Sequence, residues 1–107
     1  MPKPIAYYLG TRLTSIGVRS MYRLSTPLGW KTVEDEGITD YVVVVSKRVS
    51  WTKVITNLYA CNELGTRRAS YPIIHLKGYK NRIFDCIKRI GYKANHLTYY
   101  KRKYNNA

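Results

Sequence analysis

The chain has 107 residues, of which 45% are hydrophobic, so it is long and apolar enough to form one domain with a buried core. This composition excludes a wholly disordered protein. Nineteen Lys and Arg against six Asp and Glu give a formal net charge of +13, which indicates a polyanionic partner such as nucleic acid, acidic lipid or an acidic protein.

Hydropathy and cysteine usage indicate the cellular compartment in which we expect the protein. No apolar run reaches about 18 residues, so we expect no transmembrane helix and no membrane insertion. Residues 1–4 lack the apolar core of a signal peptide. The two cysteines, Cys61 and Cys86, are too few and too scattered for a disulfide scaffold or a zinc site. We therefore expect a cytoplasmic protein with two free thiols and no cofactor.

The first third of the chain contains two expected strands and two breaks. Residues 5–9 predict a short edge strand, with two prolines just before it. Residues 18–24 alternate between the two faces of a strand and place two arginines on its outer face. Residues 27–30 contain Pro, Gly and Trp and predict a loop. The acidic segment 34–37 is interpreted as a solvated turn in preference to a metal site.

The most apolar run, at residues 41–45, is Tyr followed by four valines. A surface helix would leave half of these valines in water. β-Branched side chains are stiff at χ1 and fit a pleated sheet, so the run predicts a strand. Because its valines point alternately to both sides, we expect a central strand that is covered on both faces.

Residues 51–64 allow two interpretations. A helix would end just before Gly65 and would place six residues on one face: Trp51, Val54, Ile55, Leu58, Tyr59 and Cys61. The segment is nevertheless rich in Thr, Val, Ile, Asn and Tyr, which are mediocre helix formers, and most of them suit strands. A hairpin with a second strand near residues 53–60 is the preferred interpretation, and the helix is the alternative.

The clearest predicted helix spans residues 81–90 and follows a strand at 71–77. Asn81 is expected to be its N-cap and Gly91 to be its C′ residue. An apolar stripe predicts the buried side of this helix, and it consists of Ile83, Phe84, Cys86, Ile87 and Ile90. The sequence thus predicts an α+β fold, with a small antiparallel sheet and a C-terminal amphipathic helix in one domain of residues 1–92. Residues 93–107 are expected to be a basic, tyrosine-rich tail.

Three segments resemble small bacteriophage proteins of unknown function. They are the valine-rich strand 41–46, the segment 59–65 running into an acidic Gly turn, and a last helix closed by Gly91-Tyr92. The resemblance covers about half of the chain and implies a hairpin after residue 50 and a phage origin. Tyr79 follows Gly78 where those proteins usually have Ser, and the basic tail is additional. The resemblance implies no functional residues.

Nothing in the sequence has the pattern of a catalytic centre, so we expect a protein that is not an enzyme. His75 lies in an apolar strand and is expected to be structural, whereas His96 is expected to contact solvent or phosphate. Cys86 is expected to be a buried thiol. A Cys86–His75 nucleophile pair is conceivable, but no oxyanion-stabilising or third group accompanies it.

The charge is concentrated in residues 66–107, which contain 11 Lys and Arg and one acid, a net +10. Cations matched to phosphates supply affinity, and exposed tyrosines can stack on unpaired bases. We therefore expect a small nucleic-acid-binding protein, for DNA or RNA, that uses a basic C-terminal face. The candidate contacts are Arg67, Arg68, Lys80, Arg82, Lys88, Arg89, Lys93, Tyr99, Tyr100, Lys101, Arg102, Lys103 and Tyr104.

The alternative is a phage protein that binds a host protein with an acidic surface and inhibits or redirects it. Trp30 and Trp51 are the candidate anchors for such an interface if they are exposed. An exposed Trp beside an uncharged patch would favour a protein partner. A continuous basic face with tyrosines would favour nucleic acid.

Overall fold

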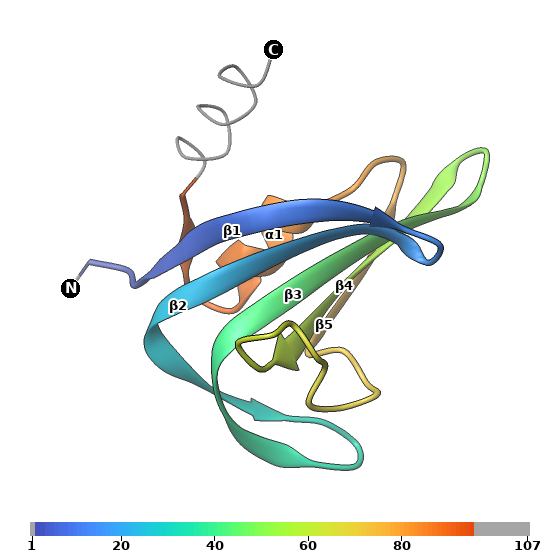
Figure 1. Cartoon of the computed structure of the whole chain (residues 1–107). Coiled ribbons are helices and arrows are strands. Elements are labelled where there is room, and N and C mark those ends of the chain that lie inside the picture. The colour runs from blue at the N-terminus through green and yellow to red at the C-terminus, as the bar shows by residue number, and fades with distance from the viewer. Residues whose placement is uncertain (1, 96–107) are drawn as a thin grey trace.

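A computed structural model describes residues 2–95 and shows a strongly curled β-sheet with one short helix against it (Figure 1). The elements, in chain order, are β1 (Ile5–Thr14), β2 (Gly17–Lys31), β3 (Glu36–Ser50), β4 (Lys53–Cys61), β5 (Ile74–Gly78), α1 (Ile83–Arg89) and β6 (Lys93–Ala94). The six strands lie in the order β5-β4-β3-β2-β1-β6. Neighbours are antiparallel except for β1 and β6, which pair in parallel.

The predicted α+β class is wrong, because the fold is mostly β and its strands run much further than the sequence predicted. β2 and β3 have 15 residues each, against the predicted strands at 18–24 and 41–45. The predicted helix at 81–90 shortens to the seven residues of α1. A single helix of two turns covers only part of the sheet, which forms a curled half-barrel.

The predicted loop at residues 27–30 is instead the second half of β2. Pro27 is exposed and lies in a β-bulge, where the register of β2 against β3 shifts between Arg23 and Leu28. A bulge tolerates Pro and bends the strand without ending it. Beyond the bulge the indole of Trp30 is buried and lies over Gly37, so this Trp belongs to the core.

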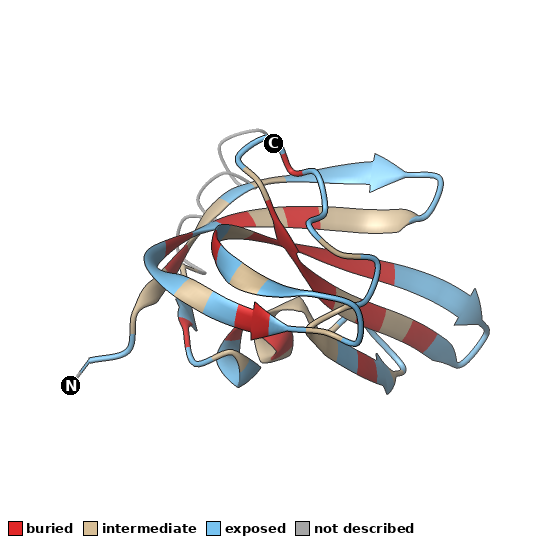
Figure 2. Cartoon of the chain, turned by 90° about the horizontal axis from the view of Figure 1, so that it is seen from below, coloured by how far each residue is buried: buried red, intermediate tan, exposed pale blue. Residues whose placement is uncertain are grey.

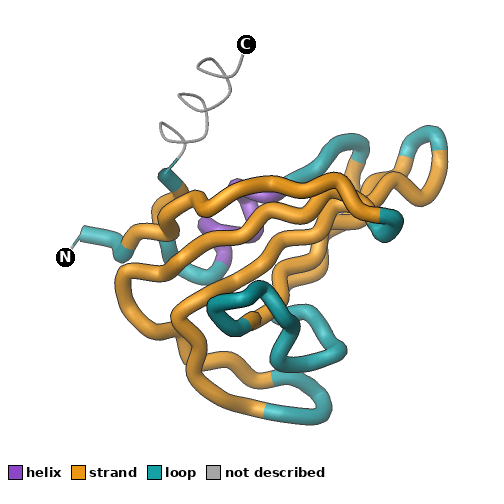
Figure 3. The backbone as a smooth tube through the Cα atoms, viewed as in Figure 1, coloured by secondary structure: helices purple, strands orange, loops and turns teal. Residues whose placement is uncertain are grey.

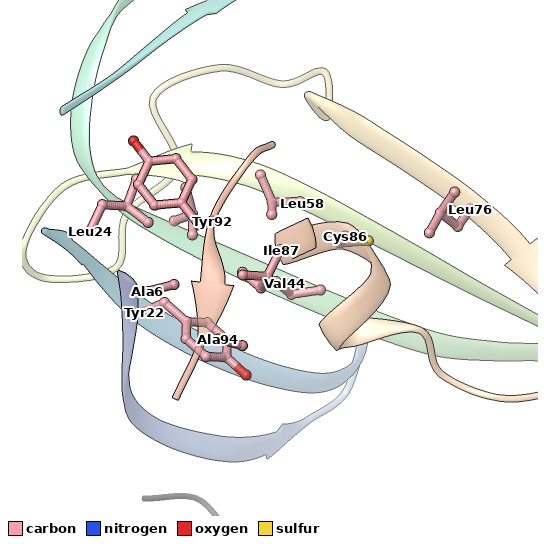
Figure 4. Packing of buried hydrophobic residues seen from close by; sticks show 11 residues of the cluster. Ala6, Tyr22, Leu24, Val44, Leu58, Leu76, Cys86, Ile87, Tyr92 and Ala94 are labelled. Atoms are coloured by element: carbon pink, nitrogen blue, oxygen red, sulfur yellow. The ribbon is translucent and has the colours of Figure 1, made fainter. Parts of the chain in front are cut away.

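The prediction of a central strand covered on both faces is confirmed (Figure 2). Val42 and Val44 join the main core with Leu58 and α1, and Val43 belongs to a second cluster on the other face. All three valines are 0% exposed. Figure 4 shows Ile87 of α1 packed beside Val44 in the main core.

The β3–β4 hairpin is also confirmed, with β4 ending one residue past the predicted strand. The turn after it is closed by the side chain of Asn62, whose Oδ1 accepts hydrogen bonds from the backbone N–H groups of Leu64 and Thr66. The strand predicted at 71–77 begins later, at Ile74.

The helix is held at its start by the sheet and not by the predicted cap. Arg82 occupies the N-cap position without a side-chain cap, and its backbone N–H donates to Thr56 Oγ1 of β4 at 3.1 Å. Asn81 is therefore not the cap. Gly91 has a φ of +88°, as predicted for the C′ residue. Cys86 and Ile87 are buried against the sheet.

The C-terminal end of the described chain returns to the sheet. Lys93 and Ala94 form β6, which pairs with Ile5 and Ala6 at the start of β1. The predicted edge strand at 5–9 is thus the first half of a longer strand with neighbours on both sides there. Within residues 2–95 no helix is both long enough and apolar enough to cross a membrane.

Candidate nucleic-acid interface

The sheet has two faces with different chemistry. One face carries α1 and the main core, and the other, which we call the basic face, carries cations and aromatic rings in cross-strand rows. The strand register gives four rows: Tyr7, Arg23, Tyr41 and Cys61; Gly10, Met21, Val43 and Tyr59; Arg12, Arg19, Val45, Asn57 and His75; Lys47, Ile55 and Lys77. No Asp or Glu occurs in these rows.

The cations of the basic face are close together and mostly exposed. Arg12 and Arg19 are direct cross-strand partners, although like charges in this arrangement destabilise a sheet. Ile55 lies between Lys47 and Lys77 in the next row. Arg12, Lys47 and Lys77 are exposed. An acid-free row of this kind is what a bound polyanion would neutralise.

Two arginines of this region stack on tyrosine rings. The Arg23 guanidinium carbon lies 4.7 Å from the centre of the Tyr7 ring, and that of Arg67 lies 4.1 Å from the centre of the Tyr59 ring. Such stacking fixes a guanidinium in place while its N–H donors remain available for phosphate. Tyr59 is buried under Arg67, so its own ring is not available to a base.

The long β4–β5 loop lies over the basic face, on the opposite side of the sheet from α1 (Figure 3). The Arg19 guanidinium donates to the carbonyl of Gly65, and Arg68 Nε donates to the carbonyl of Cys61 at 3.2 Å. Shallow hollows flank the loop: Arg12 and Leu64 line one, and Lys47 and Arg67 line the other. The loop therefore leaves cations accessible on both of its sides.

Two acidic residues lie beside the arginines of the β4–β5 loop. Glu34 and Asp35 lie on the β2–β3 turn and line one hollow together with Arg67 and Arg68. Glu34 also accepts a hydrogen bond from the backbone N–H of Ser70 at 3.0 Å. The cations nearest to this turn are thus partly balanced, and the unbalanced positive charge lies toward the other end of the sheet.

The structure divides the residues predicted from the sequence between two regions. Arg67 and Arg68 lie on the loop over the basic face. The other described candidates lie in the helix layer: Lys80 and Arg82 before α1, Lys88 and Arg89 on it, and Lys93 on β6. Arg82 is engaged by Asp85, at 2.9 Å. The remaining candidates lie outside the described residues, and they are Tyr99, Tyr100, Lys101, Arg102, Lys103 and Tyr104.

Sequence reasoning missed Arg12, Lys47 and Lys77 as candidate contacts. They lie on three different strands, and only the register of the sheet brings them to adjacent rows. A usable signal existed in the second strand, where alternation had already placed Arg19 and Arg23 on an outer face.

The thiol and imidazole groups do not form a reactive pair. Cys86 is buried with its Sγ 4.0 Å from the Thr56 carbonyl, on the face that carries α1. His75 is exposed and lies on the basic face, where its Nδ1 is 2.6 Å from Asn57 Oδ1. Burial raises the pKa of both Cys61 and Cys86 to about 11, so both thiols stay neutral. In the described part of the chain, no three His, Cys, Asp or Glu residues are grouped to hold a metal.

Comparisons of the chain with protein-family models, with curated proteins and with solved structures found no match. The geometry and charge of the molecule are therefore the basis for the function proposed below. The resemblance to phage proteins stays a prediction.

Proposed function

We propose that this protein binds nucleic acid without catalysis and that the basic face is its main contact surface. The observation that carries the proposal is a pair of adjacent acid-free rows. One contains the cross-strand partners Arg12 and Arg19, and the next contains Lys47 and Lys77 on either side of Ile55. Each cation that meets a phosphate releases a counterion, so such a surface binds nucleic acids of many sequences. A cytoplasmic site of action and a phage origin remain part of this proposal.

The basic C-terminal face expected from the sequence is a competing location for the same function. Its described members, Lys88, Arg89 and Lys93, are exposed in the helix layer. They carry the same total charge as Arg12, Lys47 and Lys77, and this equality allows a matched comparison. We favour the basic face because its cations occupy adjacent rows without an acid, and because Arg23 of the same face stacks on Tyr7.

The test compares two triple variants of equal net charge. In the first, Arg12, Lys47 and Lys77 become Gln, and in the second Lys88, Arg89 and Lys93 become Gln. All six side chains are exposed, so both variants should fold like the parent. Binding to labelled single- and double-stranded oligonucleotides is measured over a range of salt concentrations.

The basic-face variant should lose most of the affinity at low salt. Its log–log salt slope should fall by about 2 to 3, at roughly 0.7–0.9 for each lost phosphate contact. The helix-layer variant should retain a slope within about one contact of the parent. A larger loss of affinity in the helix-layer variant would show that the C-terminal face is the main interface. Absence of binding by the parent at low salt would refute the function.

The alternative partner, an acidic host protein, has one observation in its favour. Trp51 is 95% exposed, as an interface anchor would be, whereas Trp30 is only 7% exposed and cannot serve. However, Arg48 and Lys53 flank Trp51 in the same hairpin, so the patch is charged. An exposed Trp beside an uncharged patch would have favoured a protein partner, and this patch is charged. Nucleic acid therefore remains the better proposal.

A further inference from the structure

Three chain reversals lie at the same end of the sheet, which we call the turn end (Figure 1). They are the β1–β2 turn at residues 15–16, the β3–β4 turn at residues 51–52, and the β5–α1 loop at residues 79–82. The register of β4 against β5 pairs Val54 with Gly78, so Tyr79 leaves the sheet beside Lys53. Two segments far apart in sequence are therefore neighbours here.

Each of these two neighbouring reversals carries an aromatic ring in solvent. Trp51 is 95% exposed and Tyr79 is 81% exposed. At such exposure neither ring contributes burial free energy to the fold, in contrast to Trp30 in the core. The turn below Trp51 is nevertheless fixed, because the Arg48 guanidinium donates to the carbonyls of Ser50 at 3.3 Å and Trp51 at 2.8 Å.

The charge around the two rings is positive. Lys47, Arg48 and Lys53 belong to the β3–β4 hairpin, and Lys77 and Lys80 flank Tyr79. Five of the six acids lie elsewhere in the described chain: two on the β2–β3 turn, two in the first half of β3, and one after β4. The sixth, Asp85, is paired with Arg82. An anionic ligand that offers flat apolar faces matches this surface.

We infer that Trp51 and Tyr79 stack on unpaired bases, so that the turn end makes the protein prefer single-stranded to double-stranded nucleic acid. The inference rests on the proposed function, because the same cations of the basic face hold the phosphates. Every base presents a π-face, which makes stacking tolerant of sequence. In a duplex these faces are covered by neighbouring base pairs, and the two rings gain nothing. Each ring is expected to contribute roughly five- to 150-fold in affinity for a single strand.

A charged lipid surface is the principal competitor for this site. Leu13, near the end of β1, and Ile16, on the β1–β2 turn, are also exposed at the turn end, at 85% and 44%. Trp, Leu and Lys together are typical of proteins that lie on anionic membranes. The continuity of the turn end with the acid-free rows of the basic face favours nucleic acid, and vesicles provide the contrasting arm of the test.

The experiment uses the full chain with Trp51→Ala, Tyr79→Ala and Trp51→Phe. Val33→Ala is the matched control, because Val33 is an apolar side chain that is 87% exposed on the acidic β2–β3 turn. Affinity is measured by anisotropy for a labelled oligothymidine and for a blunt duplex, each of about 20 nucleotides or base pairs. Tryptophan emission is followed in parallel, with buried Trp30 as the internal reference.

The parent should bind the oligothymidine more tightly than the duplex and show quenching of Trp51 emission. Trp51→Ala and Tyr79→Ala should each weaken binding to the single strand by at least about fivefold and leave duplex binding unchanged. Trp51→Phe should recover most of the loss, and Val33→Ala should match the parent.

Three results would overturn the inference. Equal affinity of the parent for single strand and duplex, with Trp51→Ala unchanged, would refute stacking while the proposed function stands. Failure of the parent to bind either oligonucleotide would refute both. A blue shift of Trp51 emission on phosphatidylserine vesicles, without quenching by oligothymidine, would assign the turn end to a membrane surface.

Discussion

Three glycines in the first two strands allow the strain of this curled sheet to be measured. Gly17 opens β2 at a φ of +126°, and a Cβ built there would lie 2.3 Å from the backbone oxygen of Ser46 in β3. Gly10 lies at the β1 bulge with a φ of +148° and has no atom within 4 Å of such a Cβ. Gly29 has neither a restricted φ nor a close neighbour. Replacing each by Ala therefore separates backbone strain from steric conflict.

The expected losses follow from these geometries. Gly10→Ala forces an unfavourable backbone conformation and should lower the free energy of unfolding by about 1–3 kcal/mol. Gly17→Ala has the same strain and must also displace the β3 backbone, so a loss of about 3–5 kcal/mol is expected. Gly29→Ala should be neutral or stabilise by up to about 1 kcal/mol, because Ala restricts the unfolded chain.

Urea unfolding, followed by the emission of buried Trp30 and by circular dichroism, measures the three differences. Each 1 kcal/mol corresponds to roughly 4–8 °C in the melting temperature of a domain of this size. The order of stability should be Gly29→Ala, then Gly10→Ala, then Gly17→Ala. If Gly17→Ala lies within about 0.5 kcal/mol of the parent, the close approach of β2 to Ser46 is wrong.

Three further outcomes are expected. Thiol titration should find two free thiols after unfolding and little reaction before it. Burial raises the pKa of Cys61 and Cys86 to about 11, so the stability that comes from keeping these thiols neutral should be full below about pH 8.5 and should decline as the pH rises toward 11. The hydrogen bond from Arg82 lowers the pKa of Asp85, so the contribution of this bond to stability is present above about pH 4 and is lost as the pH falls through the lowered pKa. Asp85→Asn should therefore remove this part of the loss of stability in acid, as measured by urea unfolding at a series of pH values. Val43→Ala and Val44→Ala should each cost about 1.5–3 kcal/mol in the same assay, and a negligible cost for Val43 would show that its face of the sheet is open.

The sequence by itself determined the elements whose signal is local. The valine run specified a strand covered on both faces, since β-branched side chains at successive positions need burial on both sides. Alternation placed Arg19 and Arg23 on the outer face of β2, and Gly91 marked the helix end. The net charge of +13 is also set by the sequence alone, because charge is additive along a chain whatever its fold, and it predicts a polyanionic partner.

Only the tertiary structure decided how far the strands run and which cations meet. Pro27 and Gly29 predicted a loop, yet β2 continues past both residues, because a bulge allows the strand to stay paired with β3. The apolar stripe could not predict where the helix begins, because its start depends on a hydrogen bond to Thr56 in a strand that is distant in sequence. Arg12 and Lys77 lie far apart in the sequence and share adjacent rows only because strand register is a property of the whole sheet. Local patterns cannot encode such pairing, and the basic face exists only in the folded molecule.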